Sequence, residues 1–464
     1  MHISDRVLPA PRRGELPEPV ALRRMIGPSI ILVGLSIGSG EFVLWPRLTA
    51  EWGFALFWAC WVGVTLQFFL NMEIERWSLA TGESAVVGFV RLHRAFLPVF
   101  LVCATLPWVW PGWAIGAATL LHWETGSPTT PTAIGGLVLC GLVLSAGPVV
   151  YRTVEAVQLV LVGLIVLLLT GLGIAVIEPE HLWLLLEGAL RVGHVPEGIH
   201  LPMLLGALAF AGAGGSVNLA QSNYIKDKGY GMGIYIGRIT SPFTGREEAS
   251  SGVGVAFTPD AANLARWRVW WRRTNIEHFA SFYVLALGSL AGFCLIAAAL
   301  LEPGAEVSAG FGFIRDEAVA IEGRFGAIGR HSFLFVGVAV LFSTELALLD
   351  AVARVAADLL DTALRNRRSP GLSRLYFAVV WLMVANGALV LGLGFDQPLA
   401  LIVLSAALNG IVMFLYSGLL LWLNVTSFDP PVRPSALRIG ALVLTFAFFG
   451  YFSVLTLYDR LFGG

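Results

Sequence analysis

The stretch from Gly34 to Pro46, GLSIGSGEFVLWP, interrupts an otherwise apolar segment with glycines, serines and one carboxylate. The surrounding residues 27–50 are numerous enough to cross a lipid bilayer, which takes roughly 20 apolar residues. Closely spaced glycines weaken a helix, and unwound backbone at membrane depth is tolerated only where it lines a protein cavity. We therefore expect a broken first helix whose centre, Gly38-Ser39-Gly40-Glu41, forms part of a binding site.

Glu41 strengthens this expectation, because an acid at the bilayer centre costs about 2.5–3.5 kcal/mol on insertion scales and usually has a function. Glycines alone could serve close helix packing. Packing does not explain why the acid is present.

The composition identifies a multi-pass membrane protein. The chain has 464 residues, of which 56% are hydrophobic and 13% charged, and its mean hydropathy is +0.76. The net charge of -1 predicts no nucleic-acid partner. The four cysteines lie in apolar runs without metal-ligand spacing, so we expect neither disulfides nor a cofactor.

Eleven apolar runs are candidate membrane spans, at residues 27–50, 54–72, 96–120, 132–147, 153–177, 201–222, 279–301, 331–358, 374–394, 398–424 and 436–458. Most of the 30 Lys and Arg residues fall in cytoplasmic segments if the N-terminus is inside and the C-terminus outside. Residues 1–26 lack the apolar core of a signal peptide and are predicted to be a cytoplasmic tail. We expect the cell (cytoplasmic) membrane as the location and the lipid bilayer as the surroundings.

A second interruption, LAFAGAGGSVNLAQSNY at 208–224, falls in the sixth span. Its candidate binding residues are Gly214, Gly215, Ser216 and Asn218. We expect residues 27–177 and 201–424 to be two five-span repeats, in which spans one and six are equivalent. The second repeat contains a cytoplasmic loop at 224–277. Residues 436–464 add a last span and an outside C-terminus. Interrupted helices at corresponding positions of inverted repeats indicate a midplane substrate site in a secondary transporter.

The first two spans resemble a known family. The runs GPSIILVGLSIGSGEFVLWPRLTAEWGFALFW (27–58) and LQFFLNMEIERWSLATGES (66–84) look like the first two spans of the Nramp divalent-metal transporters. The resemblance implies an all-α LeuT-type fold of eleven transmembrane helices, with an inverted 5+5 repeat, broken helices 1 and 6, and alternating access.

The metal ligands of that family do not carry over. Where Nramps have Asp-Pro-Gly-Asn, this chain has Gly38, Ser39, Gly40 and Glu41; where they have Met-Pro-His-Asn, it has 215–218, of which only Asn218 is kept. Loss of the thioether and the aspartate argues against a soft transition metal. If a metal binds, Glu41 and Asn218 are its candidate ligands.

The first interruption also resembles another group. SIGSGEF (36–42) is similar to the IGSGIF break of the amino acid-polyamine-organocation transporters, in which freed backbone N–H groups receive the substrate carboxylate. Here Glu41 replaces an apolar residue.

Several roles stay open for Glu41. It could neutralise a substrate ammonium, carry a coupling proton, or bind a hard, hydrated cation such as Mg²⁺ together with other oxygen ligands. Glu345 is the second candidate for a coupling H⁺ or Na⁺ site, because no cation is near it in sequence. Asp350 and Arg354 are spaced as a structural helix pair.

The sequence therefore predicts a secondary-active, Nramp-like transporter of a small cationic or zwitterionic solute, without the transition-metal site. A transporter of a divalent cation of the Mg²⁺ type is the alternative. A receptor or scaffold that keeps the fold without transporting is a third hypothesis. No enzyme motif occurs in the chain.

Overall fold

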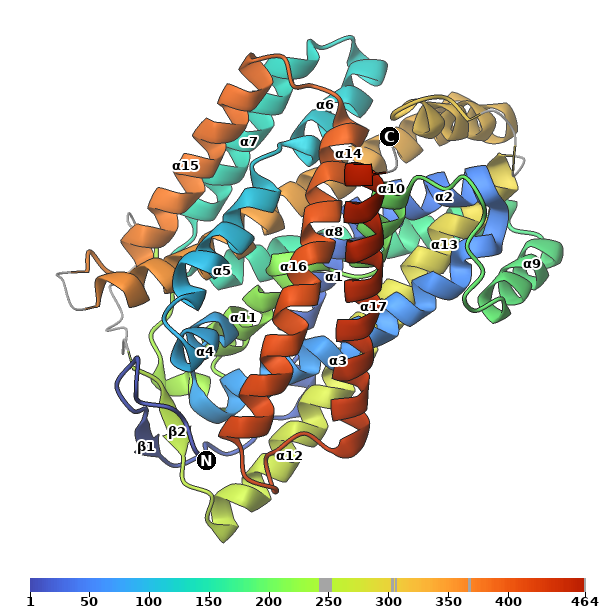
Figure 1. The fold of residues 1–464 in the computed structure, drawn as a ribbon. Helices are drawn as coiled ribbons and strands as arrows, with labels where there is room; N and C mark the ends of the chain where they lie inside the picture. The colour runs from blue at the N-terminus through green and yellow to red at the C-terminus, as the bar shows by residue number, and fades with distance from the viewer. Residues whose placement is uncertain (242–252, 302–303, 305–306, 366–368, 463–464) are drawn as a thin grey trace.

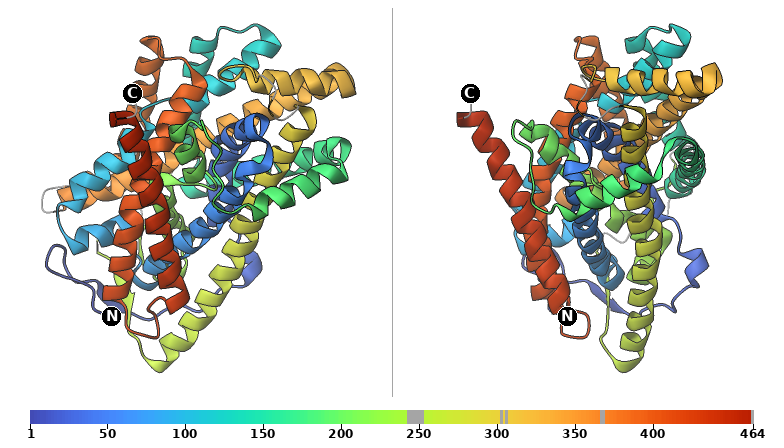
Figure 2. Two further views of the ribbon diagram at one scale, coloured as in Figure 1. Left: turned by 45° about the vertical axis from the view of Figure 1, so that its right-hand side comes forward. Right: turned by 90° about the vertical axis from the view of Figure 1, so that its right-hand side faces the viewer.

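The computed structural model describes residues 1–241, 253–301, 304, 307–365 and 369–462, with the side chain of Ser39 left out. These residues form a bundle of helices with the two termini at opposite ends (Figures 1 and 2). Opposite ends are what an odd number of membrane crossings requires. Which end faces the cytoplasm stays a prediction.

The α-helices run in the order α1 (Pro28–Ser36), α2 (Trp45–Trp52), α3 (Phe57–Thr81), α4 (Ala85–Leu92), α5 (Phe96–Thr105), α6 (Gly112–Thr125), α7 (Thr129–Ala146), α8 (Val150–Val176), α9 (Pro179–Leu190), α10 (Leu201–Ala209), α11 (Gln221–Lys228), α12 (Ala261–His278), α13 (Leu285–Leu300), α14 (Gly312–Leu364), α15 (Leu372–Gly392), α16 (Pro398–Ser427) and α17 (Ala436–Phe462). Two π-helical segments, η2 (Ile37–Leu44) and η7 (Phe279–Val284), connect neighbouring helices. The 3-10 segments are η1 (Leu22–Arg24), η3 (Gly53–Leu56), η4 (Leu106–Trp108), η5 (Gly215–Ala220) and η6 (Gly231–Tyr235).

Within the described residues, nine helical runs are long and apolar enough to cross a membrane. The first, Pro28–Thr81, has 54 residues, which at 1.5 Å per residue is about 80 Å and more than twice the bilayer core. The chain reverses within it at Gly53, whose φ of 58° only glycine adopts easily. Helices α10 and α11 have 9 and 8 residues, each too short to span alone. The count of eleven spans stays a prediction.

The last two helices lie side by side along the length of the bundle (Figure 1). Glycines on each helix make room for a ring on the other. A Cβ atom on Gly418 would lie 2.9 Å from the Phe446 ring, and one on Gly450 would lie 2.9 Å from the Phe414 ring. The two rings themselves are 4.6 Å apart between centroids. The helix pair therefore packs by reciprocal insertion of aromatic side chains.

The loop predicted at 224–277 is largely structured in its described part. Its basic, tryptophan-rich end forms α12, which continues through η7 into α13 as one helical run (Figure 2). The helix of the seventh span therefore begins at Ala261, before the predicted span, and the point at which it enters the membrane stays a prediction. A short parallel sheet, absent from the all-α prediction, pairs β1 (Arg12–Gly14) with β2 (Val255–Phe257) and ties the N-terminal tail to this loop.

Candidate functional site

The first predicted interruption is a wide helical turn and not an unwound break. Residues Ile37–Leu44 form the π-helix η2, in which the N–H of Trp45 donates to the carbonyl of Gly40, five residues back. Positive φ angles are confined to other glycines among the described residues. The expectation of freed backbone groups in span one is therefore wrong, because the π-helix keeps them bonded to one another.

The glycines of η2 serve close packing. A Cβ atom on Gly40 would lie 1.7 Å from the carbonyl oxygen of Phe210, and one on Gly38 would lie 2.1 Å from the hydroxyl of Thr344. Phe210 directly follows α10, so the π-helix touches the interruption of span six. The two interruptions are therefore in direct contact in this conformation.

Glu41 is completely buried and faces α13. The Ser36 hydroxyl lies 2.5 Å from its Oε1, and the Ser289 hydroxyl contacts its Oε2. The Ser36 hydroxyl also lies 2.9 Å from the Val33 carbonyl, and Ser289 lies 2.6 Å from that of Leu285. A hydroxyl carries one hydrogen. Each serine can therefore donate to Glu41 or to its own helix, and the pair suits a charged or a protonated carboxyl group.

Span six is broken, as predicted. Helix α10 ends at Ala209, and the φ angles of Gly212, Gly214 and Gly215 are 113°, 25° and 75°. Gly215 begins η5, which leads into α11. Side-chain amides satisfy the freed backbone groups: Gly214 N–H donates to Gln67 Oε1 at 3.0 Å and Ser216 N–H to Asn409 Oδ1 at 3.0 Å. This backbone is buried in protein, as membrane depth requires.

Asn218 belongs to the polar cluster around Gln67. Its Nδ2 donates to the Tyr416 hydroxyl at 3.3 Å and to Gln67 Oε1 at 3.5 Å, and its buried Oδ1 has no partner among the described groups. Glu41 has different partners on α1 and α13. The structure thus places the two candidate metal ligands in separate clusters. Among the described residues, no group of three or more His, Cys, Asp or Glu is placed to hold a metal ion.

An aromatic cluster that the sequence analysis missed adjoins the break. Trp108 stacks on Phe210 at 5.9 Å between ring centroids and lies 5.6 Å from Trp113. The Trp108 indole N–H donates to the Ser216 hydroxyl at 2.7 Å. Trp108 lies within an unpredicted interruption of span three, between α5 and α6, and Trp113 lies in the first turn of α6. The signal is the run LPWVWPGW (106–113), with two prolines and three tryptophans at membrane depth.

Glu345 is a buried residue of α14. Its carboxyl group accepts a hydrogen bond from the backbone N–H of Ala114, in the first turn of α6 and next to Trp113. Its Oε2 is buried and has no partner in the described part of the chain. A carboxylate at a helix N-terminus is stabilised by the helix dipole. The predicted pair of Asp350 and Arg354 is confirmed at 2.8 Å.

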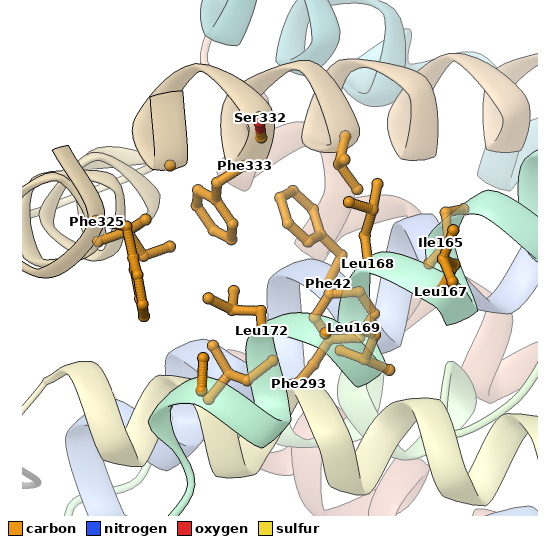
Figure 3. A pocket seen from close by; sticks show the side chains of 16 residues that line it. Phe42, Ile165, Leu167, Leu168, Leu169, Leu172, Phe293, Phe325, Ser332 and Phe333 are labelled. Atoms are coloured by element: carbon orange, nitrogen blue, oxygen red, sulfur yellow. The ribbon is translucent and has the colours of Figure 1, made fainter. Parts of the chain in front are cut away.

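An apolar cavity lies elsewhere, between α8, α13 and α14, with a volume of about 260 Å³. Its lining is almost entirely hydrocarbon, and Figure 3 shows Ser332 as the oxygen-bearing side chain among the labelled residues. Phe42 points into it while its neighbour Glu41 faces the two serines. Two consecutive residues of the π-helix therefore point in different directions, Phe42 into the apolar cavity and Glu41 toward the serine hydroxyls.

Interrupted helices that meet inside a membrane bundle define the class of fold found in secondary transporters of the LeuT type. No protein-family model and no curated protein matches this sequence. Among solved structures, a point mutant of the Eremococcus coleocola manganese transporter has a TM-score of 0.70 at 13% identity, covering 97% of this chain and 90% of that one.

Two further transporters are similar in fold. Mhp1, a nucleobase-cation-symport-1 family transporter in a closed conformation, has a TM-score of 0.53 at 12% identity, covering 99% of this chain and 94% of that one. MhsT in complex with L-phenylalanine has a TM-score of 0.51 at 13% identity, covering 93% and 98%. The chain therefore has the LeuT-type fold, as the sequence predicts.

Proposed function

We propose that this protein is an Nramp-like secondary-active transporter that moves a small cationic or zwitterionic solute by alternating access. The proposal is supported by the fold and by the meeting of the π-helix, the break in span six and the interruption of span three at one place. The solute binds where these segments meet, at Gly38, Ser39, Gly40 and Glu41 and at Gly214, Gly215, Ser216 and Asn218.

The observation that carries the choice of an organic cation is the aromatic cluster at the break. Trp108, Trp113 and Phe210 pack ring against ring, and two buried acids are attached to the neighbouring backbone: Glu41 follows the Gly40 that touches Phe210, and Glu345 binds the backbone next to Trp113. Aromatic faces and a carboxylate together attract an ammonium group. A hydrated Mg²⁺ would need several converging oxygen ligands, and Glu41 and Asn218 have separate partners.

Uptake into liposomes by the purified protein tests this proposal. Ethanolamine and alanine serve as ammonium probes, with Mg²⁺ and Mn²⁺ as metal probes, under an imposed proton or sodium gradient. We expect gradient-driven accumulation of an ammonium probe. Accumulation of Mg²⁺ alone would favour the divalent-cation alternative, and binding of a probe without accumulation would favour a receptor.

Substitution of Trp108 tests how much the aromatic ring contributes to the affinity for the ammonium probe. Cation–π contacts contribute about 0.5–2 kcal/mol, so Trp108→Leu should weaken the apparent affinity for the ammonium probe by roughly 2- to 30-fold. Trp108→Phe keeps a ring and loses the indole N–H bonded to Ser216, and should retain most of the affinity. An equal loss of affinity in both variants would show that Trp108 positions Ser216 and does not bind the cation.

A further inference from the structure

A second buried polar cluster lies where α1 begins, away from the interruptions. It consists of Ser29 on α1, Glu75 on α3, Gln221 on α11, and Glu277 and His278 at the end of α12. Every one of these side chains is at most 4% exposed. The cluster joins parts of spans one, two, six and seven.

Two hydrogen-bonded groups make up this cluster, Ser29 with Glu277 and His278 and Glu75 with Gln221, and a close approach of His278 to Glu75 links them. The Ser29 hydroxyl lies 2.7 Å from Glu277 Oε2 and 2.8 Å from His278 Nδ1. The same Nδ1 lies 3.4 Å from Glu75 Oε1, which accepts from Gln221 Nε2 at 2.6 Å. Ser29 therefore bridges a carboxyl group and an imidazole.

Buried polar atoms with no partner in the described structure belong to this cluster: Glu75 Oε2, Glu277 Oε1, His278 Nε2 and Gln221 Oε1. Such atoms are costly unless something binds to them. The imidazole is held between aromatic rings, with Phe282 stacked at 4.7 Å and Phe68 at 5.7 Å between centroids. Its orientation relative to Ser29 is thus fixed by packing.

The charged and titratable groups that act on the cluster from neighbouring elements are Arg438 on α17, Lys228 at the end of α11, Tyr151 on α8 and Tyr230 before η6. The two cations have other partners in direct contact. Arg438 pairs with Glu73 at 3.2 Å and Lys228 with Glu155 at 2.5 Å. Glu75 and Glu277 therefore lack a lysine or arginine in contact within the described residues.

We propose that Glu277, Ser29 and His278 form a proton-binding relay, with the Glu75 carboxyl group beside the imidazole. In the unloaded state the Ser29 O–H donates to the Glu277 carboxylate, and the neutral His278 donates its Nδ1–H to the Ser29 oxygen. A proton that binds the free Nε2 makes an imidazolium. Transfer of the Nδ1 proton to Ser29, and of the Ser29 proton to Glu277, then leaves a carboxylic acid and a neutral imidazole that carries its proton on Nε2.

The relay lies between the same two helical segments as the Glu41 cluster, α1 and the run from α12 to α13. Ser29 and Ser36 are seven residues apart on α1, which is two turns on one face and about 10 Å. Glu277, His278 and Ser289 all belong to the helical run from α12 to α13. Both clusters thus connect span one to span seven. As a step in transport, which rests on the proposed function, the relay hands the coupling proton between Glu41 and the end of the bundle where α1 begins.

Infrared difference spectroscopy of the full-length protein in liposomes tests proton binding without a solute. The carboxylic-acid C=O band is followed during a pH titration for the wild type, Glu277→Gln, Ser29→Ala and the control Glu124→Gln. Glu124 pairs with Arg330 and His331, outside the relay. We expect Glu277→Gln to lose a titrating band, Ser29→Ala to shift its midpoint, and the control to match the wild type.

Two results would overturn the relay. One is a carboxylic-acid titration that is unchanged in both Glu277→Gln and Ser29→Ala. The serine variant is included because it removes no charge and is therefore expected to fold even if Glu277→Gln does not. The other is removal of the band by Na⁺ at constant pH, which would make the occupant a metal cation. The outcome is separable from transport: a normal titration without solute uptake would contradict only the proposed function, and uptake without the titration would contradict only the relay.

Discussion

At the scale of the residue, Glu41 is the acid that the proposed solute must meet. It is buried with two serine hydroxyls as partners. A hydroxyl can donate to a carboxylate or accept from an amide or a carboxylic acid. The surroundings of Glu41 therefore accommodate a change of charge without any movement of the backbone.

Glu41→Gln tests the charge without changing the shape. The amide can accept from one serine and donate to the other, so we expect the melting temperature to change little. Uptake of the ammonium probe should fall at least tenfold, because the attraction to the carboxylate is lost. Glu51→Gln, which removes a half-exposed acid paired with Arg47, is the control. Normal uptake by Glu41→Gln would remove Glu41 from the site.

Arg354 illustrates a buried charge with a structural role. Its guanidinium binds Asp350 at 2.8 Å and also pairs with Asp227, and the Tyr376 hydroxyl donates to Asp350 at 2.7 Å. Arg354→Met leaves two buried acids without their cation and should cost about 3–5 kcal/mol. Arg191→Met breaks an exposed pair with Glu187 and should cost at most about 1 kcal/mol. Thermal unfolding of both variants measures the difference.

At the scale of the element, the two interruptions use glycine in different ways. In span six the glycines adopt positive φ angles and break the helix. In span one they leave the helix continuous and allow another chain segment to approach. Both kinds of segment appear in the sequence as closely spaced glycines. A single sequence could therefore predict the place of each interruption and not its backbone geometry.

Gly40→Ala tests the contact between the two interruptions. Its methyl group would overlap the Phe210 carbonyl, which is backbone and cannot turn away, and overpacking of this kind typically costs 1–3 kcal/mol or more. Gly163→Ala on α8 is the matched control, since a Cβ there meets nothing within 4 Å. We expect Gly40→Ala to lower the melting temperature and uptake, and Gly163→Ala to change neither. Equal behaviour of the two variants would contradict the contact.

At the scale of the whole molecule, the N-terminal tail is part of the folded body. The N–H of Leu16 donates to Asn263 Oδ1 at 2.9 Å, and the Trp270 indole donates to the Pro17 carbonyl at 2.8 Å. Together with the pairing of β1 and β2, these bonds fasten the tail to α12. Residues 1–26 were predicted only as a cytoplasmic tail, because these partners on α12 and β2 lie more than 200 residues away in sequence.

Two leucines in this tail provide a matched test. Leu16 is fully buried, whereas Leu22 is 39% exposed. Leu16→Ala should destabilise the protein by about 2–5 kcal/mol through lost packing, and Leu22→Ala should change stability by no more than about 0.5 kcal/mol. Thermal unfolding in detergent compares them. Equal melting temperatures would show that the tail detaches.

Structure that depends on local sequence pattern was predicted, and structure that depends on contacts between distant residues was not. Hydropathy predicted most spans, and the glycines predicted the break at 212–215. The stacking of Trp108 on Phe210 and the bond from Gln67 to the break join residues about 100 and 150 positions apart. Such contacts depend on how the helices pack, which a single sequence does not reveal.

Ligand-induced thermal stabilisation tests most simply whether Glu41 and the neighbouring aromatic cluster bind an ammonium solute. Purified wild-type protein and Glu41→Gln are melted with ethanolamine, alanine, Mg²⁺ or Mn²⁺. A ligand present at 100 times its Kd stabilises by about 2.7 kcal/mol, so an ammonium probe should raise the melting temperature of the wild type and not of Glu41→Gln. Stabilisation by Mg²⁺ or Mn²⁺ alone, or equal stabilisation of both proteins by the ammonium probe, would contradict the claim.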